Sequence, residues 1–427
     1  MSARAALLAL ALVAHAAPAR AGTSRGDAPG APVVERLLDG TTMLFLARPG
    51  AARAAVRVVV RAGADDDPPG RAGLAELTAH AVLQGTYDMR PGALFRLVEN
   101  AGGTFGLEVA PDATVLAIDV GTAGVRDALG ALLKTVTAPA LPFIDLERAR
   151  FIVGTVDVEA APLRRAGWAA RHVAFPSGHG GLVSSGSGET RRAVTRDDVA
   201  TFFQEHWVPW RTTVIVVGDL ERDEVRRLVE QGLHGAPVPD APRARDQRSP
   251  NVPSEAHGKG RRTMAVSAAV LEPAPDAACA TAAALLELRL RRELAREDLV
   301  ETHAGCERAF GAQLLSVAVR STSASASTLP ELVRAVRRSG RTRPVSVAER
   351  AQVAKRVAAR HAGALVEVPA TAALLADAAR ADEPLDEAGA ARALKPLRLD
   401  WAGAARVLAM AGADQRAVEV AFSPFTQ

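Results

Sequence analysis

The chain has 427 residues, which is too long for one ordinary hydrophobic core and sufficient for two domains of about 200 residues each. Hydrophobic residues make up 48% of the sequence and charged residues 23%, which is the balance of a globular protein. Arginine is abundant and lysine is rare. We interpret this skew as the codon bias of a GC-rich genome, because a nucleic-acid surface would cluster its basic residues.

The first 21 residues have the form of a secretory signal peptide. Arg4 precedes an apolar run over residues 5–14, and Ala19-Arg20-Ala21 is a small-x-small cleavage site. The apolar run is shorter than the ~20 residues that a membrane span needs, and no later stretch is long and apolar enough. We therefore expect cleavage after Ala21 and a periplasmic or secreted protein. Cleavage removes two arginines and lowers the formal net charge from +4 to +2, which is too weak to indicate a nucleic-acid or anionic-membrane partner.

Residues 22–32 are rich in Gly and Pro and are expected to form a flexible N-terminus. The first half then follows as residues 33–235. Hydrophobic periodicity, Pro and Gly positions and capping residues predict its elements in this order: strands within 33–64, helices over 69–84 and 91–103, a hairpin over 104–121, helices over 122–139 and 144–161, a capped helix over 195–207, a strand over 211–220 and a helix over 223–235.

Residues 236–262 are rich in Pro and charge, lack a hydrophobic period and are predicted to be a linker. The second half, residues 263–427, repeats the order of the first: a strand, a long helix over 275–297, further strands, two helices and a final strand over 416–425. The pattern predicts two similar α+β halves. Cys279 and Cys306 could pair in an oxidising compartment or remain buried thiols, and their spacing does not decide between these.

Several segments together resemble a known family. They are "GLAELTAHAVLQGT" (Gly73 to Thr86), "FRLVENAGGTFGLEVAPDATVLAIDV", "DLERARFIV" and "VTRDDVATFFQEHWVPWRTTVIVVGDL". They are similar to the N-terminal domain of the insulinase/pitrilysin metallopeptidases, which include the mitochondrial processing peptidase subunits. The resemblance implies two homologous domains, each a mostly antiparallel β-sheet with helices packed on one side.

In that family an inverted H-x-x-E-H motif places two zinc-binding His one turn apart and a general base between them. The resemblance places the first His at Glu76, the base at Ala79, the second His at His80 and a distant third ligand, a Glu, at Val156. Ala79 cannot accept a proton and Val156 cannot ligate a metal. We therefore expect no catalytic residue and no bound metal, with Glu76 and His80 forming a same-face helix pair.

The sequence also offers candidates for metal ligands and for substrate-binding residues. Glu76 and His80, with Asp157 or Glu159, would form a divergent zinc site if the alignment shifts. Family members also carry a substrate-binding Arg and Tyr in the second half. The resemblance implies Arg296 as the candidate for the Arg, and it places the Tyr position near Thr302 or His303.

These features favour a catalytically inactive homologue that binds extended peptides or helps to enclose a chamber. Its expected partner is a homologous zinc-bearing peptidase subunit in the periplasm, or a second copy of itself. One alternative is a divergent but active zinc metalloendopeptidase, for which zinc would be the cofactor. Another is a structural subunit of an envelope complex.

Overall fold

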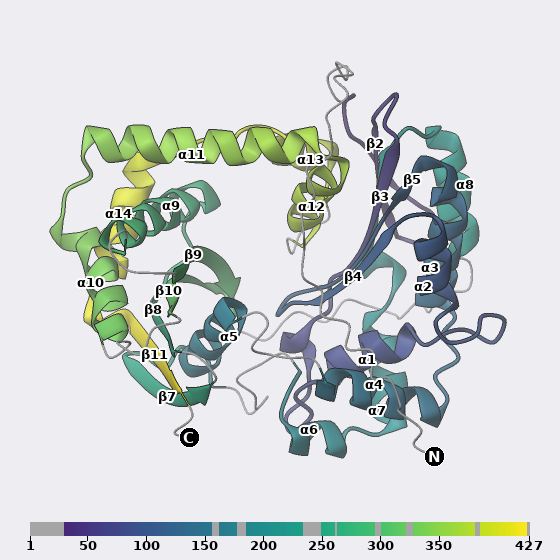
Figure 1. Cartoon of the computed structure of the whole chain (residues 1–427), viewed down its shortest axis with the longest axis horizontal. Helices are drawn as coiled ribbons and strands as arrows, with labels where there is room; N and C mark the ends of the chain where they lie inside the picture. Colours follow the sequence, from purple (N-terminus) through teal and green to yellow (C-terminus); the bar gives the residue numbers. More distant parts are fainter. Residues whose placement is uncertain are drawn as a thin grey trace, which may run out of the picture.

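The computed structural model shows two α+β halves that lie side by side, each built on one sheet (Figure 1). The predicted fold class is confirmed, because both sheets are mostly antiparallel and carry helices. The residues described are 30–155, 162–176, 185–233, 249–260, 263–294, 300–321, 328–380 and 385–424.

The first half has a six-stranded sheet in the order β1-β2-β6-β3-β5-β4. Its strands are β1 (Val33–Arg36), β2 (Thr42–Ala47), β3 (Arg53–Val60), β4 (Thr104–Val109), β5 (Thr114–Gly121) and β6 (Thr212–Gly218). The helices that cover one face or extend beyond the sheet are α1 (Leu74–Val82), α2 (Ala93–Asn100), α3 (Val125–Thr137), α4 (Phe143–Thr155), α6 (Gly188–Ala193), α7 (Arg196–His206) and α8 (Arg222–Gly232).

The second half has a five-stranded sheet in the order β7-β11-β8-β10-β9. Its strands are β7 (Ser254–Gly260), β8 (Thr263–Leu271), β9 (Val300–Ala309), β10 (Ala312–Ser321) and β11 (Ala417–Pro424). Its helices are α9 (Asp276–Glu293), α10 (Leu329–Thr342), α11 (Val347–Val366), α12 (Val368–Ala379), α13 (Glu387–Ala393) and α14 (Trp401–Ala411). The last strand of each half lies inside its sheet: β6 is parallel to β2 and β11 is parallel to β7. Apart from β1, the two sheets therefore share one strand order.

Each half gives the other a helix. α5 (Pro162–Ala174) belongs to the first half in sequence but packs on the second sheet, where Ala169 and Phe175 join the same hydrophobic cluster as Val266. α12 belongs to the second half but packs on the first sheet, where Leu375 lies in a cluster with Val59. The helices of each half cover one face of its own sheet, as predicted, and the exchanged helix covers the other face. Because both faces of each sheet are covered by helices, every residue of β6 and of β8 is buried.

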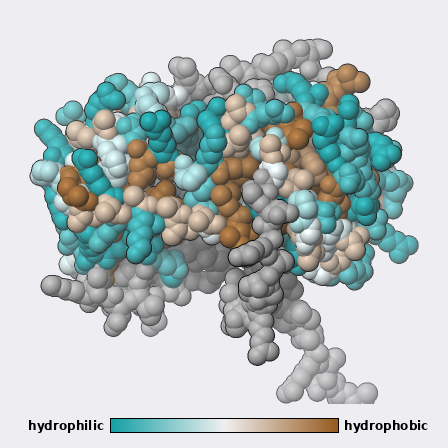
Figure 2. Space-filling model, turned by 90° about the horizontal axis from the view of Figure 1, so that it is seen from above, coloured by the Kyte–Doolittle hydropathy of each residue, from teal (hydrophilic) through white to brown (hydrophobic). Residues whose placement is uncertain are grey.

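Helix α11 connects the two halves along the top of the molecule in Figure 1, on the face that Figure 2 shows from above. It contacts α9 at one end and α12 at the other, and only Glu349 and Val353 of its residues are buried. In the part of the chain that the structure describes, no single helix is long and apolar enough to cross a membrane. α11 and α12 meet that criterion only as a pair, which is bent by 113°.

Two sequence-based predictions differ from the structure. α1 begins at Leu74 and not at Pro69, because Gly73 has a left-handed φ of 95° that ends the preceding loop. β7 lies inside the segment predicted to be a linker, since an edge strand with many exposed residues shows no hydrophobic period. The structure also joins Cys279 of α9 to Cys306 of β9 in a disulfide, with Cα atoms 5.9 Å apart.

Candidate functional site

Helix α1 carries Glu76, Ala79 and His80 on neighbouring turns. Its apolar residues, including Leu74 and Leu77, are buried in the core of the first half, and it packs against α4 and α7. The helix also lies beside β4, the last strand of the first sheet. The three residues are therefore held on a fixed helix next to a sheet edge.

Glu76 and His80 contact each other. His80 Nε2 lies 3.5 Å from Glu76 Oε1, and the exposed fractions of the two side chains are 17% and 15%. This is the contact expected for residues four apart on one face of a helix, which stabilises a helix by a few tenths of a kcal/mol. The pair brings one imidazole nitrogen and one carboxylate oxygen to the same point, and these are two donors of the kind that zinc accepts.

Ala79 is fully buried in the hydrophobic core of the first half. Its methyl group offers no proton acceptor, so a water molecule near His80 would find no base at this position. A carboxylate here would also enter an apolar environment, which strongly disfavours the charged form.

Four of the remaining candidates are not tested by the structure. Val156, Asp157, Glu159 and Arg296 all lie outside the described residues. Thr302 and His303 lie on β9 of the second half, and burial lowers the pKa of the His303 imidazole.

The donors that the described residues bring together at α1 are too few for a zinc site. A catalytic zinc needs three protein ligands and an open position for water, whereas α1 supplies two. Among the residues that the structure describes, no group of three or more His, Cys, Asp or Glu side chains is placed to hold a metal ion.

Asp67 fixes the start of α1. Its two carboxylate oxygens accept hydrogen bonds of 2.7 Å from the backbone N–H groups of Gly73 and Ala75. Burial raises the pKa of Asp67 well above its ordinary value, although the two N–H donors act in the opposite direction. Sequence reasoning missed this residue because a carboxylate six residues before Gly73 lies outside the usual capping position. The run Asp65-Asp66-Asp67 just before the helix was the available signal.

Asp65 connects the same loop to the second half through Arg171 of α5. The buried Arg171 guanidinium forms an ion pair with Asp65, donates to the carbonyl oxygen of Arg308 over 3.0 Å, and approaches Glu307 of β9 to 3.5 Å. It also lies over the ring of Phe310, 4.9 Å from the centroid. The loop before α1 is thus attached to both halves of the chain.

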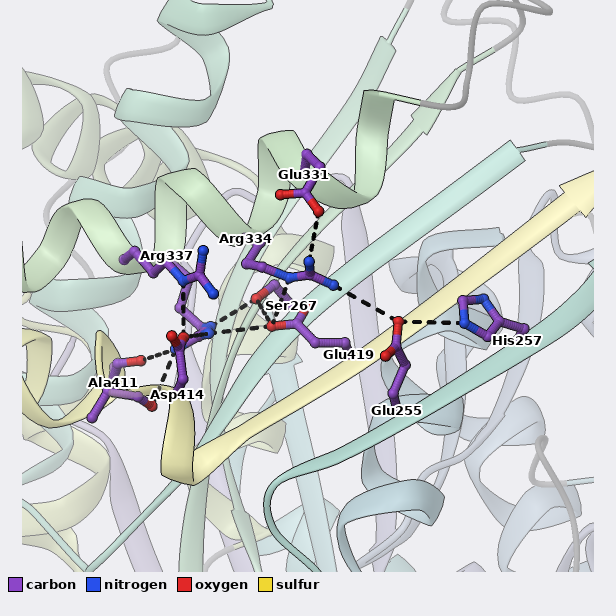
Figure 3. Close-up of polar contacts among 11 residues, drawn as sticks. Glu255, His257, Ser267, Glu331, Arg334, Arg337, Ala411, Asp414 and Glu419 are labelled. Atoms are coloured by element: carbon purple, nitrogen blue, oxygen red, sulfur yellow. Dashed lines mark hydrogen bonds and ion pairs between the residues drawn. The ribbon is translucent and has the colours of Figure 1, made fainter.

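A second charged cluster lies between α10 and the second sheet (Figure 3). Arg337 is 1% exposed and donates to Ser267 Oγ over 2.7 Å, to the Ala411 carbonyl oxygen over 2.5 Å and to Asp414 over 2.9 Å. The same guanidinium lies 3.2 Å from Glu419. Because its donors are directed at acceptors within the fold, this cluster anchors α10 and presents no free group for a ligand.

The backbone of β4 is a candidate for peptide binding. β4 pairs only with β5 among the strands of the described chain, so one row of its N–H and C=O groups has no strand partner there. Residues 104–108 are exposed or half-buried, and only Val109 is buried. This edge lies next to α1, and an extended peptide that pairs with β4 would pass the helix carrying His80.

Comparisons with known proteins agree with this architecture. The model of the insulinase family (peptidase family M16) matches residues 42–164, and the model of the peptidase M16 inactive domain matches residues 193–302. No curated protein sequence matches the chain significantly.

Solved structures share the fold at low sequence identity. A protease from Helicobacter pylori is 16% identical with a TM-score of 0.77, over 92% of this chain and 99% of that one. A peptidase M16 inactive domain from Pseudomonas fluorescens is 16% identical with a TM-score of 0.72, over 92% of this chain and 98% of that one. The periplasmic protease PqqL from Escherichia coli is 15% identical with a TM-score of 0.66, over 92% of this chain but 47% of its own length. Because the two models of this family together match more than half of the chain and the fold is shared along most of its length, the chain belongs to the insulinase family of peptidases, family M16.

Proposed function

We propose that this protein is a catalytically inactive member of the insulinase family that binds extended peptides or helps to enclose a peptide chamber. Its partner would be a zinc-bearing homologous peptidase subunit in the periplasm. The observation that carries the proposal is Ala79, a buried methyl group on the helix turn where the family has its general base. General-base catalysis usually contributes about 100- to 10,000-fold to a rate, so its loss removes most of a hydrolase's activity.

The relatives support a partner of the same fold. PqqL contains roughly twice the length that this chain matches, so that protein carries further sequence beside the shared unit. A second homologous chain would supply the equivalent part here. The periplasmic location of PqqL and the disulfide between Cys279 and Cys306 both support an oxidising compartment for this chain.

The first experiment measures metal content and peptide hydrolysis by the purified chain alone. We expect far less than one zinc per chain and no chelator-sensitive cleavage of unstructured peptides. Adding a zinc-bearing homologue from the same genome should give a complex by size-exclusion chromatography and change that enzyme's peptidase rate. Stoichiometric zinc with cleavage by the isolated chain would refute inactivity, and absence of a complex would refute the proposed partnership.

Peptide binding at β4 has its own test. A fluorescent extended peptide should bind the chain through backbone hydrogen bonds, so the same peptide with alternate amides N-methylated should lose most of its affinity. The side chains of the two peptides are identical, so equal affinities would exclude pairing with a strand edge. Failure of both peptides to bind would favour the structural subunit of an envelope complex.

One observation favours a second candidate function, a divergent zinc peptidase. His80 Nε2 and Glu76 Oε1 already meet within 3.5 Å, and Asp157 or Glu159 would complete three ligands. In that case His80→Ala and Glu76→Ala should each abolish zinc binding, while Glu99→Ala on the exposed end of α2 should not. If none of the three changes alters metal content, this candidate fails.

A further inference from the structure

Exposed apolar side chains concentrate on helix α4, which lies next to α1 and α7 in the first half (Figure 1). Eight large hydrophobic residues are exposed in the part of the chain that the structure describes. Three of them belong to this one helix: Phe143, Ile144 and Phe151, which are 61%, 51% and 73% exposed. A single exposed hydrophobic residue is ordinary, whereas a cluster of them usually marks an interaction site.

Helix α4 is apolar on both of its sides. Leu146, Ala149 and Val153 are buried in the core of the first half, mainly against α1. At 100° per residue, Ile144 and Phe151 project within about 20° of each other, on the side opposite to the buried residues. A helix that is hydrophobic all round is normally covered on both sides. Among the described residues, only the inner side of α4 is covered.

Tyr87 lies close to the start of the same helix. It is 88% exposed and belongs to the loop that follows α1. Thr86 pairs with Pro139, and the Ala140 N–H donates to the carbonyl oxygen of Gly85, so this loop is attached to the segment that leads into α4. The loop therefore extends the apolar surface beyond the helix.

The charged residues of α4 are neutralised within the helix itself. Arg148 Nη1 lies 2.9 Å from Asp145 Oδ1, and Arg150 forms an ion pair with Glu147. Gly154 lies further along the outward side, and no described atom is within 4 Å of the position that a Cβ would take there. The outward face of α4 thus offers apolar groups, balanced charge and room for a close approach.

The area of this face matches what a dimer needs. The three α4 side chains expose on the order of 350 Å², and Tyr87 adds roughly 150 Å², taking about 200 Å² for a whole aromatic side chain. Two copies of the face would together bury about 1,000 Å² of apolar surface. A stable interface buries about 1,600 Å² in total, slightly more than half of it apolar. A second copy of the chain therefore supplies the matching area and polarity.

We propose that the outward face of α4, together with Tyr87, pairs with the same face of a second copy of this chain. The contact is isologous, so the same residues meet across a twofold axis. No unpaired charge of α4 opposes it, because both arginines of the helix already have acidic partners. The pairing does not depend on the proposed function, since Glu76, Ala79 and His80 belong to α1.

The first test measures association of the mature chain by analytical ultracentrifugation over a range of concentrations. We expect a dimer that dissociates on dilution. Phe151→Glu should raise the dissociation constant roughly 100-fold or more, because each dimer contains this residue twice and loss of a central aromatic costs about tenfold or more per site. The matched control, Val366→Glu on α11, introduces the same charge at a side chain that is 74% exposed and should associate as the wild type does. Both variants should keep the wild-type Tm.

A second test locates the contact without changing an apolar side chain. The two native cysteines form a disulfide, so an introduced cysteine is the only free thiol. Gly154→Cys places the thiol on α4, and the control Gly363→Cys places it on α11. Both are helical glycines with no described atom within 4 Å of the Cβ position. A short bifunctional maleimide should cross-link Gly154→Cys into a dimer and leave Gly363→Cys monomeric.

A monomer at every concentration would overturn the proposal. Equal association of Phe151→Glu and Val366→Glu, or equal cross-linking of the two cysteine variants, would overturn it as well. If the wild type alone stays monomeric but binds the zinc-bearing homologue through Phe151, the face belongs to that partner and pairing with a second copy is wrong. These measurements report on neither metal content nor peptide binding, so the proposed function stands or fails separately.

Discussion

At the scale of single residues, the position of α1 depends on a carboxylate that belongs to the preceding loop. Asp67 accepts two backbone hydrogen bonds at the start of α1 and is 2% exposed. Ala79 and His80 are placed by this helix, so the geometry of the candidate site depends on Asp67 as much as on the site residues.

Asp67→Ala should lower the free energy of unfolding by about 2 kcal/mol, because two buried N–H groups lose their acceptors. Asp67→Asn keeps one acceptor oxygen and should lose less. Urea unfolding of the three proteins measures the effect. Asp197→Ala is the control, because Asp197 is an exposed residue in the first turn of α7. If Asp67→Ala lowers the free energy of unfolding no more than Asp197→Ala does, Asp67 does not have this role.

Glu349 predicts an acid dependence of stability. Burial alone would raise its pKa, but hydrogen bonds from Arg289 and from the Ser346 N–H lower it from 4.5 to about 2. A carboxyl with a lowered pKa in the folded state stabilises the protein above its unfolded pKa. We therefore expect this contribution, on the order of 3 kcal/mol, to be present above pH 4.5 and lost as the pH falls towards 2.

Urea unfolding between pH 5 and pH 3 measures this loss, and Glu349→Gln is the control because it cannot titrate. The variant should be less stable at pH 5 and should show a shallower dependence on pH. Parallel curves for the two proteins would show that Glu349 ionisation does not contribute.

At the scale of elements, the edge strand β9 is attached to α9 by the disulfide between Cys279 and Cys306. β9 pairs only with β10 among the described strands, so the disulfide adds a second attachment on the side facing α9. Arg337 attaches the next helix, α10, to the same sheet (Figure 3). The disulfide and the contacts of Arg337 therefore help to stabilise the second half, whose core consists mostly of alanine and other aliphatic residues.

Replacing both cysteines by serine should lower the free energy of unfolding by about 3–4 kcal/mol, because the disulfide closes a loop of 27 residues in the unfolded chain. Thermal unfolding of the wild type with reductant should match the variant without it. If the reduced wild type keeps its Tm, the disulfide does not contribute to stability.

At the scale of the whole molecule, the exchange of α5 and α12 makes the two halves interdependent. Each sheet has one face covered by a helix from the other half, and Arg171 adds an ion pair across the same boundary. The halves are similar in sequence order and strand order, yet neither covers its own sheet completely.

Leu375→Ala should therefore destabilise both halves. Leu375 is fully buried against the first sheet, and its truncation should cost about 3 kcal/mol. Hydrogen exchange should show faster global exchange in β8 of the second half as well as in β6 of the first. Leu38→Ala, at a fully exposed position, is the control. Faster exchange confined to the first sheet would show that the halves unfold separately.

Local patterns in the sequence were sufficient for the α+β class, the internal repeat and most elements, including α7 with its Thr195 cap and the long helix α11. Periodicity predicts such elements because it depends on neighbouring residues alone. The contact between Glu76 and His80 follows in the same way from their spacing on one helix.

Tertiary structure decided what covers each sheet, which cysteine state is present and how α1 is held. α5 was not predicted as a helix, and its contact surface lies in the other half, so no local pattern identifies it. The contacts of Arg171 likewise depend on residues that are far apart in sequence, and those of Asp67 depend on how the preceding loop folds onto α1. Sequence determines secondary structure through neighbouring residues, whereas burial, ion pairing and surface charge arise only when distant segments pack together.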